Sequence, residues 1–298
     1  MKSLGRLLTA MITPFDASGA LDLTESVRVA EFLVERGNDG VVLAGSTGEG
    51  SALEGDEKLA LFDAVKRALG SRATVIAGTG DNNTRRSIVL TKAAEALGVD
   101  AALLTVPAYV KPTQEGMLAH FGAIAEATSL PCVVYNIPGR TGANMLPATF
   151  HELTRRHQNI VGIKESSGDL NQFTAILRGN REGVSLWAGD DYLYLPALAV
   201  GAHGCVSVAA HLAGNELRAM ADAYAGGDVA RAGAIHRELA PLIAALFATS
   251  SPIPVKWAMG TYGFDVGACR SPLSALPEPL QAQLEPLIAP YRPEWARS

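Results

Sequence analysis

Short apolar runs alternate with amphipathic segments along most of this chain, and this alternation constrains its fold more than any other feature. Each apolar run has the length and the Val, Ile, Leu and Ala content of a buried strand, and the segments between the runs have helical periodicity. The predicted strands span residues 7–13, 41–44, 74–77, 102–106, 132–135, 160–164, 185–188 and 205–208. The predicted helices span residues 24–36, 56–69, 85–97, 114–127, 147–156, 171–178 and 192–200.

Eight strands that each lead into a helix predict a parallel sheet, because parallel strands need a crossover connection and a helix usually provides it. Right-handed crossovers allow such a sheet to close on itself. We therefore predict an α/β fold, a (β/α)8 TIM barrel. A doubly wound open sheet is the alternative architecture.

Four more helical patterns follow the eighth predicted strand, at residues 212–225, 229–248, 254–262 and 276–288. This is more helix than an eight-fold barrel needs. We expect the barrel to occupy residues 1–225 and a C-terminal helical extension, packed on the barrel, to occupy residues 226–298. A proline-rich, exposed stretch should begin at residue 290.

Composition excludes several classes of partner. Charged residues make up 18% of the 298 residues and the net charge is -5, so the surface lacks the basic character that attracts nucleic acid or an anionic membrane. An anionic substrate must therefore be bound by local cations. The longest apolar region, residues 192–213, contains proline, glycine and histidine, which argue against a membrane span.

The cysteines point to a reducing compartment. Cys132, Cys205 and Cys269 are odd in number and lack C-x-x-C spacing, as expected of buried thiols that form neither disulfides nor a zinc site. The apolar segment that follows Lys2 and Arg6 has no cleavage signal and is typical of a first strand. We expect a cytoplasmic protein.

One predicted strand ends in a lysine. Because side chains alternate along a strand, Ile160, Gly162 and Lys164 should share one face and point into the barrel. In apolar surroundings a lysine ammonium loses hydration, its pKa falls, and the neutral amine can form a Schiff base with a carbonyl substrate. The alternative is a strand-end lysine that extends to water.

The residues that follow the strands are further candidates, because active sites of such barrels lie at the C-terminal ends of the strands. Residues 45–49 (GSTGE) follow the second strand and residues 78–82 (GTGDN) the third. They are either simple turns or glycine-rich loops whose N–H groups bind a carboxylate. No Lys-Ser/Thr pair follows them, which argues against a nucleotide-binding P-loop.

Tyr135 and Arg140 lie at the end of the fifth strand and just beyond it. Tyr135 has the parity of Val133, so it can share the barrel interior with the lysine, and its hydroxyl needs a partner such as Ser46 or Thr47. Arg140 is either one half of a surface ion pair or a bidentate clamp for a carboxylate.

The acidic and histidine residues near the last two strands are expected to be structural. Asp190 and Asp191 follow the seventh strand, but no third ligand lies at a useful spacing, so we favour helix N-capping over metal binding and predict no metal. His203 and His211 flank the eighth strand without a carboxylate motif and are predicted to be structural.

Several motifs, taken as a set, resemble the dihydrodipicolinate synthase and N-acetylneuraminate lyase family of class I, Schiff-base aldolases. The resemblance runs from about residue 8 to residue 276. The motifs are GSTGE at 45–49, GTGDN at 78–82, KPTQEG at 111–116, YNIPGRTG at 135–142, GIKE at 162–165, AGDD at 188–191 and SPIPVK at 251–256.

The resemblance implies that Lys164 condenses with pyruvate and that no other cofactor takes part. It implies that Thr47, with neighbouring backbone amides, binds the pyruvate carboxylate, and it places Gly189 and Val206 beside the substrate. Arg140 would bind the carboxylate of the second substrate, aspartate semialdehyde. The expected product is 4-hydroxy-tetrahydrodipicolinate, in lysine and diaminopimelate biosynthesis.

The resemblance also implies an assembly. Tyr135 would pass protons through Ser46 to Tyr109, which in the family reaches in from the neighbouring subunit of a homodimer, usually within a homotetramer. Synthases usually carry threonine where this chain has Ser46, and the lyase branch also carries serine. The alternatives are therefore another pyruvate-dependent aldolase, acting on a sugar acid, N-acetylneuraminate or 4-hydroxy-2-oxoglutarate, and a catalytically silent barrel that senses a ligand.

The dimer interface is also where lysine-sensitive members of the family bind lysine, among a histidine, a glutamate and a tyrosine. Alignment puts Lys58, Arg86 and Ala108 at those places and retains Asn82. Exchanging a carboxylate for cations repels an ammonium-bearing ligand. We expect lysine to inhibit this protein weakly or not at all.

Overall fold

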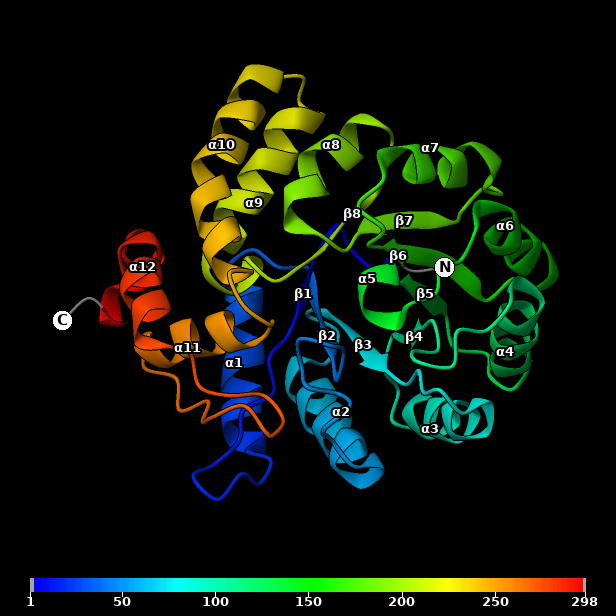
Figure 1. Cartoon of the computed structure of the whole chain (residues 1–298), viewed down its shortest axis with the longest axis horizontal. Coiled ribbons are helices and arrows are strands. Elements are labelled where there is room, and N and C mark those ends of the chain that lie inside the picture. Colours follow the sequence, from blue (N-terminus) through cyan, green and yellow to red (C-terminus); the bar gives the residue numbers. More distant parts are fainter. Residues whose placement is uncertain (1–2, 297–298) are drawn as a thin grey trace.

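The chain forms a closed barrel of eight parallel strands in sequential order, β1 to β8 (Figure 1). The structure is a computed structural model that describes residues 3–296. The predicted TIM barrel is confirmed and the open sheet is excluded, because β1 pairs with both β2 and β8. The strands are β1 Leu7–Ala10, β2 Gly40–Leu43, β3 Thr74–Gly78, β4 Ala101–Thr105, β5 Cys132–Asn136, β6 Ile160–Glu165, β7 Ser185–Ala188 and β8 Gly204–Ser207.

Helices surround the barrel where amphipathic segments were predicted, and most of their ends agree within one or two residues. The sequence did not indicate one short helix, α5, which begins at a proline and carries Arg140. The helices between the strands are α1 Leu23–Glu35, α2 Gly55–Leu69, α3 Thr84–Ala96, α4 Gln114–Glu126, α5 Pro138–Thr141, α6 Pro147–Arg156, α7 Leu170–Gly179, the 3-10 turn η1 Asp191–Leu193 and α8 Tyr194–Ala199.

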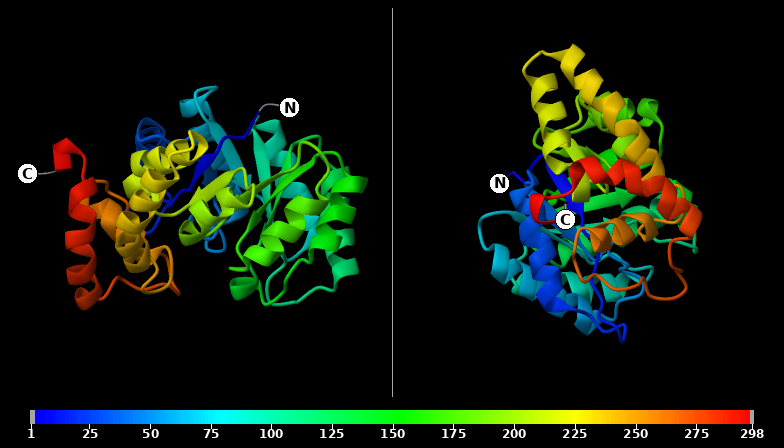
Figure 2. Two further views of the ribbon diagram at one scale, coloured as in Figure 1. Left: turned by 90° about the horizontal axis from the view of Figure 1, so that it is seen from above. Right: turned by 90° about the vertical axis from the view of Figure 1, so that its left-hand side faces the viewer.

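The C-terminal helices gather on one flank of the barrel (Figures 1 and 2). Helix α10 packs on α9, and α12 packs on α10 and α11. Only a short turn separates α9 from α10, so the division at residue 225 stays a prediction. These helices are α9 Ala210–Ala225, α10 Val229–Leu246, α11 Ile253–Thr261 and α12 Glu278–Ile288.

The proline-rich end is less exposed than predicted. It forms two 3-10 turns, η2 Ala289–Tyr291 and η3 Glu294–Ala296. Pro293 is buried, and the ring of Trp295 contacts Phe264 at a centroid distance of 5.5 Å. An aromatic ring can cover apolar surface, which the proline content alone does not reveal. Residues 297–298 of the predicted stretch lie outside the described residues.

Two apolar layers result from the alternation of side chains along the strands. One fills the barrel interior and includes Leu8, Val133 and Val206, and the other lies between the sheet and the helices. Cys132 and Cys205 belong to the outer layer, and Cys269 is half-buried; all three are free thiols. Within residues 3–296, no helix is long and apolar enough to cross a membrane.

Strand β6 departs from strict alternation. Its register with β5 shifts before Val133, which pairs with Gly162, so β6 contains one extra residue. As a result, Ile160 packs against the helices and Val161 faces the barrel interior. The prediction that Ile160 shares the face of Lys164 is wrong, because a β-bulge interrupts the period of two. The inward placement of Gly162 and Lys164 is confirmed.

Candidate active site

Lys164 lies inside the barrel near the C-terminal end of β6. Its side chain is only 5% exposed, and its Nζ lies 4.1 Å from the centroid of the Tyr135 ring on the adjacent strand β5. Within residues 3–296 the amino group has no carboxylate partner. The lysine therefore does not extend to water, and an incoming carbonyl group would meet an amine that no ion pair holds.

Gly189 gives this lysine its space. A β-carbon at this position would lie 2.9 Å from Lys164 Cε and would overlap Ser166 Oγ. Contacts this short are essentially never observed for a real β-carbon, so a larger residue would displace the lysine side chain. Val206, also predicted to border the substrate, belongs to the same interior cluster as Tyr135.

The GSTGE loop, residues 45–49, is a tight turn after β2. The N–H of Glu49 donates to the carbonyl of Ser46 at 3.2 Å, and Thr13 Oγ1 donates to the carbonyl of Gly48 at 2.7 Å. Glu49 adopts a φ of 51°, in the left-handed region that non-glycine residues rarely occupy. Thr47 is buried, and these contacts hold the loop at the barrel mouth.

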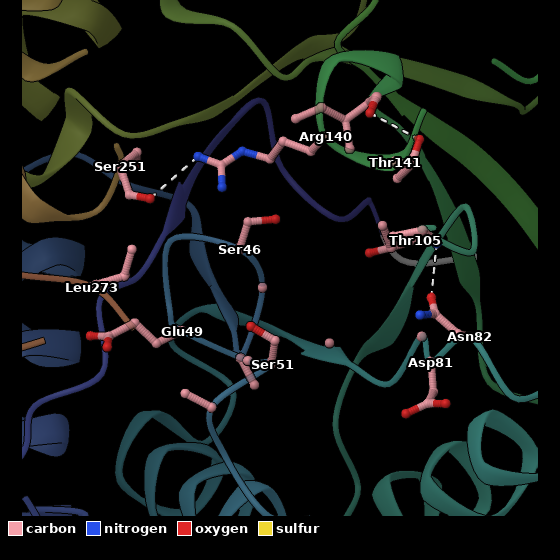
Figure 3. A pocket seen from close by; sticks show the side chains of 18 of the residues that line it. Ser46, Glu49, Ser51, Asp81, Asn82, Thr105, Arg140, Thr141, Ser251 and Leu273 are labelled. Carbon is pink, nitrogen blue, oxygen red and sulfur yellow. Dashed lines mark hydrogen bonds between the residues drawn. The ribbon is translucent and has the colours of Figure 1, made fainter. Parts of the chain in front are cut away.

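A cavity of about 420 Å³ lies at the C-terminal mouth of the barrel, between the segments that follow β2 to β5 and the C-terminal part of the chain (Figure 3). Ser46 and Arg140, two of the predicted site residues, line it. Lys164 and Tyr135, which lie within the barrel, and Thr47, which is buried in its loop, are not among the lining residues.

Arg140 extends across the cavity above Ser46 toward Ser251 (Figure 3). Its Nη2 donates to the carbonyl of Ser251 at 3.3 Å. Within the described part of the chain it forms no ion pair, which excludes that alternative for this subunit. The remaining guanidinium N–H groups are free to bind a carboxylate.

Tyr109 does not reach the cavity of its own subunit. Its side chain is 90% exposed, and it is absent from the lining residues, whereas its neighbour Ala108 is among them. The backbone at Tyr109 has a φ of 70°, and its N–H donates to the carbonyl of Thr141 at 3.2 Å. No hydrogen bond joins the Tyr135 hydroxyl to Ser46 in residues 3–296, so the predicted relay is not assembled within one chain.

Comparison with known proteins agrees with this geometry. The model of the Dihydrodipicolinate synthetase family matches residues 3–290. The chain is 54% identical over 269 residues to the 4-hydroxy-tetrahydrodipicolinate synthase of Moorella thermoacetica, covering 90% of this chain and 92% of that one. The chain belongs to the Dihydrodipicolinate synthetase family.

Solved structures of the family show the same fold. The dihydrodipicolinate synthase of Bacillus anthracis superposes with a TM-score of 0.94 at 42% identity, covering 97% of this chain and 98% of that one. The enzyme of Cyanidioschyzon merolae, solved with lysine bound, has a TM-score of 0.94 at 41% identity, covering 95% of this chain and 97% of that one.

Sequence reasoning missed a buried carboxylate beside the family's lysine. Glu165 is fully buried and accepts hydrogen bonds from Ser167 N at 2.6 Å, Asn136 Nδ2 at 3.0 Å and Gln172 Nε2 at 3.1 Å. Burial raises its pKa, although these hydrogen bonds act in the opposite direction. The network joins the ends of β5 and β6. In the GIKE motif an acidic residue directly follows the inward lysine, and this adjacency was the signal that the sequence offered for a buried carboxylate.

The paired aspartates after β7 have structural contacts, and the first of them is a helix cap. Asp190 accepts from the N–H of Tyr192 at 3.0 Å and begins the 3-10 turn, which confirms the N-capping prediction. Asp191 is buried and accepts from the N–H groups of Val208 and Ala209, and burial raises its pKa. In the described residues, no group of three or more His, Cys, Asp or Glu side chains could hold a metal ion.

Both histidines near β8 have structural contacts, as predicted. His211 is fully buried; its Nε2 accepts from the N–H of Ile12 at 3.1 Å and its Nδ1 donates to the carbonyl of Val208 at 2.8 Å. Burial lowers the pKa of His211 to about 4. His203 packs edge-on against Trp187.

We predict that His211 makes the fold sensitive to acid. An unfolded histidine has a pKa near 6.5 and the folded one about 4, so between these values the unfolded chain binds more protons. The stabilisation is complete above the unfolded value and is lost as the pH falls toward 4, by up to about 3 kcal/mol. Urea unfolding at about pH 7 and about pH 5 measures it. The loss should be smaller in His211→Gln, and equal losses in both proteins would contradict this account.

Proposed function

We propose that this protein is a Schiff-base-forming lyase that condenses pyruvate with L-aspartate 4-semialdehyde to 4-hydroxy-tetrahydrodipicolinate. The observation that carries the proposal is Lys164, which is buried beside Tyr135 and has no ion-pair partner within residues 3–296. Relatives that bear the synthase name, at 54% and 46% identity over nearly the whole chain, support it. A cytoplasmic place in lysine and diaminopimelate biosynthesis is part of the proposal.

The chemistry begins at Lys164 Nζ. The neutral amine adds to the ketone carbon of pyruvate, and loss of water leaves an iminium ion. The iminium ion withdraws electrons, so a methyl proton is lost and an enamine forms. The enamine carbon attacks the aldehyde carbon of the semialdehyde, whose oxygen takes up a proton. The substrate amine then displaces the lysine and closes the ring, which regenerates the free enzyme without a metal or redox cofactor.

Proton transfer is assigned to Tyr135, whose ring contacts Lys164 Nζ. A positioned general acid or base contributes about 10²–10⁴-fold to such steps. Ser46 lines the cavity and would pass the proton on to Tyr109 of a second subunit. The 90% exposure of Tyr109 supports this role, because an exposed aromatic side chain is suited to an interface. We propose a homodimer or homotetramer as the active form.

Substrate binding is divided between two carboxylate sites. Thr47 and the amides of the GSTGE loop would bind the pyruvate carboxylate, with Gly189 and Val206 bordering the pyruvate. Arg140 would bind the carboxylate of the semialdehyde through the N–H groups that Ser251 leaves free. A sugar-acid lyase needs no such arginine at the place where its aldehyde substrate binds. Arg140 therefore favours the synthase over the other aldolases of the family.

The proposal predicts a covalent pyruvate adduct on Lys164. Borohydride reduces an iminium ion to a stable amine, so reduction in the presence of pyruvate should add the reduced pyruvate mass to the peptide that contains Lys164. Lys164→Met, which keeps most of the side chain's length but has no amine, should form no adduct. An adduct on Lys111 or Lys256 in the wild-type protein would refute the assignment.

Arg140→Ala should reduce kcat/KM for the semialdehyde about 100-fold and leave the pyruvate adduct intact. The reason is the loss of charge-assisted hydrogen bonds, worth roughly 1.5–3 kcal/mol each. Arg178→Ala, at an exposed position on α7, is the matched control and should behave like the wild type. Faster turnover with N-acetylmannosamine than with the semialdehyde would contradict the proposed substrate.

The shared site predicts complementation between subunits. Tyr109→Phe and Lys164→Ala are each expected to be inactive. Mixing them under exchange conditions should create hybrids in which one site has both side chains, and so restore part of the activity. Mixing Tyr109→Phe with the double variant Tyr109→Phe/Lys164→Ala should restore none. Mixtures that remain inactive in both experiments would indicate a site contained in one subunit.

Lysine should inhibit weakly or not at all. Lys58, Asn82 and Ala108 line the cavity, whereas Arg86 does not, so one of the two predicted cations is in place. Burial lowers the pKa of Lys58, while nearby Asp81 acts in the opposite direction. Initial rates at rising lysine concentration test this, and Lys58→Met should be more sensitive than the wild type. Half-inhibition of the wild type at submillimolar lysine would contradict it.

A further inference from the structure

The SPIPVK motif, residues 251–256, ends in a second buried lysine that the proposed chemistry does not use. Lys256 lies on α11 and is 2% exposed. Its Nζ donates to Glu49 Oε1 at 2.7 Å and to the carbonyl of Ala268 at 3.0 Å, and it lies 4.1 Å from the centroid of the Phe15 ring. The ammonium group is thus fully enclosed by one carboxylate, one carbonyl and one ring.

Its partner, Glu49, is the last residue of the GSTGE loop and lies 207 positions away in the sequence. The other oxygen, Glu49 Oε2, accepts from the N–H of Arg270 at 2.7 Å. Both oxygens of this carboxylate are therefore bound by the C-terminal part of the chain. In Figure 3, Glu49 lies on the side of the cavity where Leu273 of the C-terminal part approaches the loop.

The loop depends on this anchor because its backbone is not relaxed. The left-handed φ of Glu49 is unfavourable for a residue with a β-carbon and persists only where the surroundings hold it. Removing one member of a buried ion pair leaves an unpaired charge, which draws the remaining group toward water. Any movement of Glu49 toward water would move Thr47, two residues away.

The nearby arginine does not duplicate this anchor. The guanidinium of Arg270 lies 4.2 Å from the Phe15 ring centroid and binds the carboxylate of Glu57 and the carbonyls of Gly19 and Ala52. The Arg270 side chain thus holds the segments around the loop in place. Only the backbone N–H of Arg270 reaches the Glu49 carboxylate. Within residues 3–296, Lys256 alone supplies a positive side chain to that carboxylate.

We propose that Lys256 is a positioning residue for pyruvate binding: through Glu49 it holds the GSTGE loop so that Thr47 and the loop amides meet the pyruvate carboxylate. Lys256 thereby acts on the active site from the C-terminal extension without lining the cavity. This inference rests on the proposed function, because it takes pyruvate as the ligand of the loop.

The test is the formation of the borohydride-trapped adduct over a range of pyruvate concentrations, without the second substrate. In Lys256→Met the half-saturating pyruvate concentration should rise on the order of 10–100-fold, as expected when a binding group shifts by about 1 Å. Lys66→Met is the matched control. Lys66 Nζ also binds one carboxylate, of Asp100 at 2.7 Å, and one carbonyl, of Gly70, but lies on α2 away from the loop. Its loss should leave the half-saturating concentration unchanged.

A double variant keeps the test decisive if Lys256→Met fails to fold. Glu49→Gln/Lys256→Met buries no unpaired charge, and the glutamine can still accept from Arg270 N. This double variant should fold. Its half-saturating pyruvate concentration should exceed that of the wild type by about threefold or more, and it should stay below that of any folded Lys256→Met.

Wild-type values in Lys256→Met or in the double variant, or an equal rise in Lys66→Met, would overturn the inference. A wild-type protein that forms no adduct would instead refute the proposed function.

Discussion

A lysine held inside a closed barrel is the constraint on which the rest of this structure depends. Lys164 is nearly inaccessible, yet its amino group lies over the Tyr135 ring and has no carboxylate partner within residues 3–296. Room for it exists because Gly189 has no side chain. One layer below, Gly162 leaves space for the ring of Trp187. Small residues beside large ones thus let a long lysine side chain lie among apolar side chains at interior packing density.

Buried acids organise the loops at the mouth of the barrel. Within residues 3–296, Glu165 and Asp191 accept only from neutral donors, whereas Glu49 also binds the ammonium of Lys256. A buried carboxylate without its partners is costly, so each network admits few alternative loop positions. Rigidity at the mouth is therefore obtained from polar contacts rather than from the apolar core.

The C-terminal helices are connected to the mouth of the barrel by two contacts of one segment, residues 251–256. Ser251 accepts from Arg140, and Lys256 binds Glu49, so a single segment contacts both candidate carboxylate-binding regions. The boundary predicted at residue 225 therefore separates regions of sequence but not independent parts of the site.

The sequence by itself determined the order of the strands and helices and the inward direction of Tyr135 and Gly162, because periodicity is a property of neighbouring residues. It also determined family membership, through motifs such as GSTGE and GIKE. Sequence periodicity failed at Ile160, where pairing with β5 inserts a bulge.

Only the tertiary structure decided the register shift in β6, the seating of Arg140 against Ser251, the exposure of Tyr109 and the pairing of Glu49 with Lys256. The physical reason is that the periodic direction of side chains along a strand or helix depends on residues that are neighbours in the sequence. In contrast, the partner of a buried charge depends on which distant segments meet once the barrel has closed.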